Sequence, residues 1–97
     1  MFNETTQKAK EIARQFSADF PPSLLDKESR KVDDKFGRAL LKFRGNIVIY
    51  QKEERMWYVR RIVFFNALQS ELLEMGYLTN TVRHLISEGM SALSFGN

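Results

Sequence analysis

Few side chains in this sequence have the types and spacing that chemistry needs. The chain contains no cysteine and one histidine, His84. This composition excludes disulfides, thiolate nucleophiles and a histidine metal cluster. The sequence also has neither a glycine-rich phosphate loop nor a G-x-S-x-G nucleophile motif. We therefore expect a protein that is not an enzyme, with no catalytic residues, no metal ligands and no cofactor.

The polar residues best suited to a ligand lie late in the chain, where residues 65–87 resemble a helix-turn-helix. Gly76 would end the first helix and Thr79 would cap the second, with Val82 and Leu85 packed inward. The outward residues could then reach base edges or phosphates. The predicted nucleic-acid contacts are Asn80, Thr81, Arg83 and His84, with Arg60 and Arg61 as phosphate contacts.

DNA binding through this segment is the alternative function rather than the favoured one. Leu72 stands where a helix-turn-helix has a small residue, and Glu71 stands where it has an apolar one. An ordinary αα-hairpin has the same glycine stop and polar cap. The charge favours an acidic partner or phosphates, because residues 38–61 carry seven basic and two acidic side chains, a local charge of +5 in a chain of +3.

The favoured function is protein–protein interaction in a regulatory or adaptor-type role. Residues 62–65, Ile-Val-Phe-Phe, are apolar on every side of a helix. A helix buries such a run only at the centre of a fold or against a partner, and a chain of this length has few helices to surround it. We therefore expect self-association, most simply a homodimer, or binding to another protein. The predicted interaction residues are Trp57, Phe64 and Phe65.

The elements that position these residues are mainly helices. At 97 residues and 43% hydrophobic content, the chain is expected to be one domain, residues 1–97, with about four helices. Asn3 is the expected cap of a first helix that ends at Pro21-Pro22. Residues 23–26 have the spacing of a capping box for a second helix, which Gly45-Asn46 would end.

Residues 46–61 form the ambiguous part of the sequence. Residues 47–50 and 56–59 are β-branched and aromatic runs around a polar gap, which favours a central β-hairpin. The gap lacks turn residues and its side chains prefer helix, so a continuous helix is the alternative.

The last two helices have the clearest periodicity. The first is expected from Ile62, with Gly76 just after its end. The apolar stripe predicted to form the core contains Phe65, Leu68, Leu72 and Met75, packed against Phe16, Phe36 and Leu40. No apolar run approaches the roughly 20 residues of a membrane span, and the absence of cysteine fits a reducing compartment. We expect a cytoplasmic protein.

Overall fold

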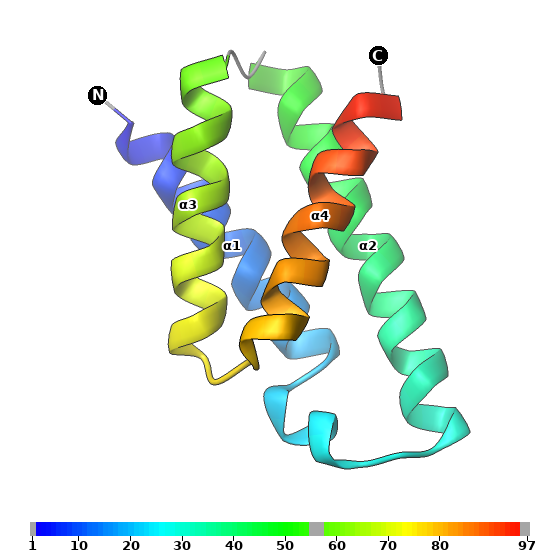
Figure 1. Cartoon of the computed structure of the whole chain (residues 1–97). Helices are drawn as coiled ribbons and strands as arrows, with labels where there is room; N and C mark the ends of the chain where they lie inside the picture. Colours follow the sequence, from blue (N-terminus) through cyan, green and yellow to red (C-terminus); the bar gives the residue numbers. More distant parts are fainter. Residues whose placement is uncertain (1, 55–57, 96–97) are drawn as a thin grey trace.

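The computed structural model describes residues 2–54 and 58–95, and within them the chain forms four α-helices and no strand (Figure 1). The helices are α1 (Asn3–Asp19), α2 (Arg30–Glu54), α3 (Tyr58–Glu74) and α4 (Thr79–Phe95). A short 3₁₀ helix, η1 (Pro22–Asp26), lies between α1 and α2. The mainly α prediction is confirmed.

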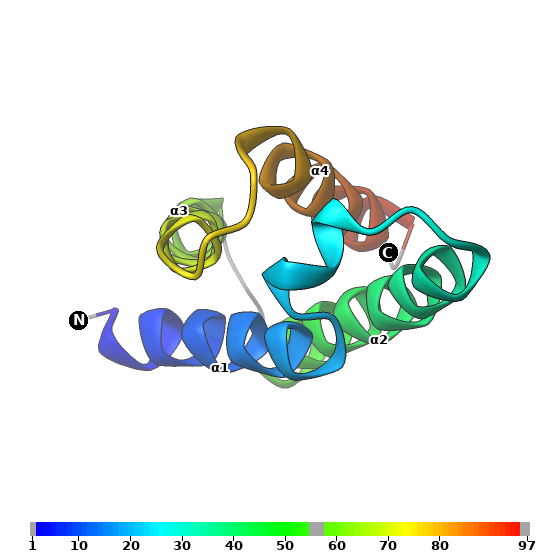
Figure 2. The ribbon, with the colours of Figure 1, turned by 90° about the horizontal axis from the view of Figure 1, so that it is seen from below.

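The helices form a bundle of two layers, with α1 and α2 in one and α3 and α4 in the other (Figure 2). Around the bundle α1 packs against α2 and α3, while α4 packs against α3 and α2. Thus α2 and α3 follow each other in sequence but occupy diagonally opposite corners. The bundle measures 40 × 26 × 19 Å.

The core is rich in aromatic rings. Each of the four helices either contributes rings to the core or covers it. The Phe16 ring lies 5.4 Å from the Phe43 ring and 5.6 Å from the Tyr77 ring, between centroids. The predicted core stripe is confirmed: Phe65, Leu68 and Leu72 are buried, and Met75 is partly buried against them. Phe16 is also buried, whereas Phe36 and Leu40 pack against the core from its edge.

The predicted central β-hairpin is wrong. Residues 46–54 continue α2, residues 58–61 open α3, and residues 55–57 lie outside the described part of the chain. Ile47 and Tyr50 are buried three residues apart, so they share one helical face that the strand pattern conceals. Gly45-Asn46 does not end the helix either, because glycine weakens a helix without stopping one that packs on both sides of it.

Two predicted helix starts also need correction. Residues 23–26 belong to η1, and α2 begins later, where the Val32 amide donates to the Ser29 hydroxyl at 3.2 Å. At α1 the N-cap residue is Phe2, with no side-chain hydrogen bond, so Asn3 lies inside the first turn. A serine three residues before Val32 was the sequence signal for the true start of α2.

The turn between α3 and α4 forms as predicted and is anchored to α1. Gly76 has a φ of +103°, the left-handed conformation that glycine tolerates at a helix end. The next residue, Tyr77, is buried, and its hydroxyl donates to the Phe20 carbonyl at the end of α1. Burial raises the pKa of Tyr77 to about 12, although the Ser17 hydroxyl partly offsets this.

Candidate functional site

Two of the three interaction residues predicted from the sequence, Phe64 and Phe65, are buried. Phe64 is 0% exposed and Phe65 is 6% exposed, so both are core residues. The Phe64 ring lies 5.4 Å from Tyr50 and 5.2 Å from Phe65, between centroids. The expected exposure is corrected for both, because neighbouring helices enclose this side of α3, although Phe65 also lines the groove described below. Trp57 lies outside the described residues.

The predicted nucleic-acid contacts fall into two separate groups. Arg60 and Arg61 lie in the first turn of α3, whereas residues 80–84 lie at the start of α4, at the other end of the bundle (Figure 1). The length of α3, 17 residues, separates the two groups by about 25 Å. Asn80, Arg83 and His84 are exposed, and Thr81 is half-buried.

The two helices of the supposed helix-turn-helix lie side by side and run in opposite directions (Figure 1). This is the arrangement of an αα-hairpin, whereas the helices of a helix-turn-helix cross steeply. Leu72 is fully buried, and Glu71 pairs with Arg14 of α1 at 3.9 Å. His84 stacks on Phe36, with ring centroids 6.2 Å apart. DNA binding by α4 stays a prediction.

Three basic side chains of residues 38–61, those of Lys42, Arg44 and Arg60, have partners within the described residues. Arg44 pairs with Glu88 at 2.8 Å, which joins α2 to α4. Lys42 lies 3.6 Å from Asp19 of α1, and Arg60 donates to the Glu54 carbonyl at 3.2 Å. The local charge of +5 therefore stabilises helix packing as well as raising the surface potential.

A groove opens between the N-terminal end of α3 and the C-terminal end of α4. Its volume is about 340 Å³. Tyr58 is 80% exposed at its mouth and Ile62 is 46% exposed, one helical turn further on. The residues that line the groove are Tyr58, Arg61, Ile62, Phe65, Met90 and Leu93. The four-residue spacing of Tyr58 and Ile62 was the sequence signal for this groove.

One polar group in the groove lining has no partner. The Nε atom of Arg61 is buried and has no hydrogen-bond partner among the described residues. A buried donor without an acceptor is costly. Among the acceptors that another molecule could supply to this guanidinium, a carboxylate would be the strongest.

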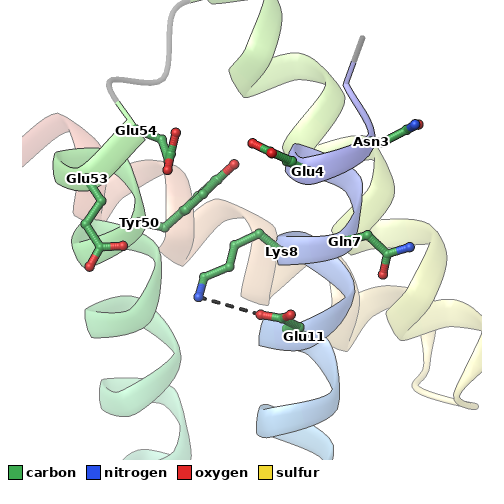
Figure 3. Close-up of a pocket in the computed structure, with 8 residues that line it drawn as sticks. All are labelled: Asn3, Glu4, Gln7, Lys8, Glu11, Tyr50, Glu53 and Glu54. Carbon is green, nitrogen blue, oxygen red and sulfur yellow. Dashed lines mark ion pairs between the residues drawn. The ribbon is translucent and has the colours of Figure 1, made fainter.

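A second hollow lies between α1 and α2, and its lining is acidic (Figure 3). Its volume is about 380 Å³, and four glutamates line it together with Asn3, Gln7, Lys8 and Tyr50. Lys8 lies 3.6 Å from Glu11 and 6.0 Å from the centre of the Tyr50 ring, so a cation of the protein itself already sits there. The Tyr50 hydroxyl, at the base, donates to the Thr5 hydroxyl at 3.4 Å.

The carboxylates of this hollow do not converge on one point (Figure 3). Among the described residues, no group of three or more histidine, cysteine, aspartate or glutamate side chains is arranged to hold a metal ion. The α3–α4 groove is therefore the better candidate for a binding site.

The described helices also include none with the length and apolar content of a membrane span.

Comparison of the chain with protein-family models, with curated proteins and with solved structures finds no match.

Proposed function

We propose that this chain is a small, non-enzymatic protein of regulatory or adaptor type that acts through protein–protein interaction. Its docking site is the α3–α4 groove, and the occupant is an amphipathic helical segment of another protein with acidic residues beside its apolar face. The observation that carries the proposal is the apolar groove at whose wall the Arg61 Nε is buried without an acceptor.

The shape and lining of the groove favour a helix. Grooves between two helices bind amphipathic helices, whose apolar residues at i, i+3 or i+4, and i+7 enter the groove. Tyr58 and Ile62 are large apolar side chains left exposed at its edge. Burying exposed apolar area of this kind contributes about 25 cal/mol per Å² before the costs of association.

The charge of this layer favours an acidic partner. Glu71 and Glu88 are the half-buried acids of α3 and α4, and each pairs with an arginine of the other layer. Arg61 lines the groove and Arg60 precedes it in the first turn of α3, with no acidic side chain paired to either within the described residues. A carboxylate carried by a partner would pair with Arg61, whose guanidinium can bind it in a bidentate geometry.

The proposal is tested with a synthetic peptide rather than with an unknown partner. The probe is an amphipathic helix with leucines at i, i+4 and i+7 and glutamates beside them, and its control carries lysines in place of the glutamates. We expect the glutamate peptide to bind and to shift the backbone NMR signals of α3 around Tyr58 and Ile62. Equal binding of both peptides, or shifts elsewhere, would contradict the proposal.

Two variants locate the site. Ile62→Asp places a charge on the groove wall and should abolish binding, whereas Leu78→Asp changes a similarly exposed leucine on the α3–α4 turn and should leave binding unchanged. Arg61→Glu should reverse the preference so that the lysine peptide binds better. Loss of binding to both peptides in Arg61→Glu, with the fold intact, would show that charge does not select the partner.

A further inference from the structure

The outer face of α2 carries large apolar side chains that the bundle leaves uncovered. Leu41 is 71% exposed and Ile49 is 56% exposed; they lie eight residues and about 80° apart on the outer half of the helix, and Ile49 also borders a hollow beside α1. This face points away from the core, because Phe43 and Ile47 of the same helix are buried on the opposite side. It is separate from the α3–α4 groove, which lies in the other layer (Figure 2).

Two glycines alternate with these side chains at steps of four, in the order Gly37, Leu41, Gly45 and Ile49. A Cβ added to Gly37 or Gly45 would meet no atom within 4 Å. Nothing inside the described chain therefore requires glycine at either position. Each glycine costs the helix about 1 kcal/mol relative to alanine.

The face is self-complementary when two copies of α2 pair in opposite directions. With the two-fold axis on the outer face at the level of residue 43, each Leu41 meets the hollow at Gly45 of the second copy, and each Ile49 meets the hollow at Gly37. A closed two-fold dimer needs this kind of patch, in which one surface contacts an identical copy of itself.

The charged residues at the two ends of the face follow the same register. At the two ends of the face lie Asp34 and Lys52, both exposed and neither ion-paired within the described residues. Asp34 and Lys52 lie equally far from residue 43 along the helix, as Leu41 and Gly45 do. In an antiparallel pair, each Asp34 is therefore level with Lys52 of the second copy. Opposite charges at both ends select this register over shifted ones.

From these observations we infer that the chain forms a two-fold homodimer through the outer faces of antiparallel α2 helices. The self-association predicted from the sequence is thereby assigned to a surface other than the one expected. A dimer of this kind would present two α3–α4 grooves, but its formation does not depend on what the grooves bind.

Crosslinking tests the orientation and the register. The chain contains no cysteine, so Asp34→Cys and Lys52→Cys each introduce one thiol. In the dimer, identical positions lie about 27 Å apart along the helix axis, whereas position 34 lies beside position 52 of the second copy. A short bismaleimide should therefore link the equimolar mixture and neither variant alone. Crosslinking of either variant by itself, or no crosslinking of the mixture at about 1 mM protein, would overturn the inference.

Sedimentation equilibrium measures the contribution of the face. Leu41→Glu should weaken self-association at least about tenfold, whereas the control Leu78→Glu, which changes another exposed leucine, should not. Asp34→Lys should weaken it, and the double variant Asp34→Lys/Lys52→Asp should restore it. A dimer unaffected by Leu41→Glu would place the interface elsewhere and overturn the inference, while peptide binding by the same variant would still report on the groove.

Gly45→Leu separates association from folding. Leucine is a better helix former than glycine, so the monomer should become more resistant to denaturant. The same side chain fills the hollow that receives Leu41, so the dimer should weaken at least about tenfold. Unchanged self-association in this stabilised variant would show that the hollow at Gly45 is not used.

Discussion

The two faces of α2 have similar side chains and opposite surroundings. Ile47 is 0% exposed beneath α4, and Ile49, two residues later, is 56% exposed. The contrast extends to glycine: Gly89 of α4 is buried against Ile47, whereas Gly45 of α2 lies in open space. Packing within the bundle explains the residue types on the inner face of α2, but it does not explain those on the outer face.

This difference separates residues that the packing of the bundle requires from residues that we infer to contact another molecule. A Cβ at Gly89 would lie 2.9 Å from Ile47 Cδ1 and 3.0 Å from Phe65 Cε1, so glycine there permits close packing of α4. No such contact explains Gly45. Paired substitutions on the two faces turn the comparison into measurements.

The largest expected difference is between Ile47→Ala and Ile49→Ala. Ile47→Ala should lower the free energy of unfolding by about 2–5 kcal/mol, because it leaves a cavity in the core. Ile49→Ala should change it by less than about 0.5 kcal/mol, since the side chain is largely in solvent. Denaturant unfolding at a protein concentration too low for association measures both. Equal losses would mean that the inner and outer faces are wrongly assigned.

The fold was predictable where periodicity was clean. The stripe from Phe65 to Met75 repeats every three or four residues, so both the helix and its buried face follow from the sequence. Residues 47–50 are apolar at every position, which conceals the helical period and mimics a strand. Only their neighbours in space, Phe64 of α3 and the core side of α4, decide which of them are buried.

An intermediate difference in the free energy of unfolding is expected between the substitutions of two tyrosines. Tyr77 is buried and donates to the Phe20 carbonyl, whereas Tyr58 is 80% exposed. Tyr77→Phe leaves that buried acceptor without its donor and should cost about 1–3 kcal/mol. Tyr58→Phe should cost almost nothing. A Tyr77→Phe variant as stable as the wild type would show that water satisfies the carbonyl equally well.

The same tyrosine predicts a pH dependence. Burial raises the pKa of Tyr77 to about 12 in the folded protein, from the 10.0 of a tyrosine exposed to water. The unfolded chain therefore loses this proton more readily, so the stabilisation is complete below about pH 10 and is lost as pH rises through 12. Between pH 9 and pH 12 the free energy of unfolding should fall by about 2 kcal/mol more in the wild type than in Tyr77→Phe. Parallel curves for the two proteins would contradict this.

The candidate site was harder to predict than the fold. The sequence marked residues 62–65 as apolar on every side, and the groove includes Ile62 and Phe65 of that run together with Tyr58, one helical turn earlier. Phe64 and Phe65 were chosen as surface residues because an apolar run alone does not say which members face a neighbouring helix. The packing of α3 between α1 and α4 makes that choice, and it depends on contacts between residues far apart in the chain.

The smallest expected effects are those of Gly89→Ala and Gly45→Ala. This comparison is the most specific, because the two substitutions should change the free energy of unfolding in opposite directions. Gly89→Ala gains helix propensity but forces Ile47 and Phe65 to move, and overpacking of a core costs about 1–3 kcal/mol. Its net effect should be a loss of about 1 kcal/mol. Gly45→Ala meets no atom and should gain about 0.5–1 kcal/mol. Thermal or denaturant unfolding of the two variants, measured at low protein concentration, provides the comparison.

Stabilisation by Gly89→Ala would show that α4 can move away from α2 at little cost. Destabilisation by Gly45→Ala would show that the outer face of α2 is already packed against something in the monomer.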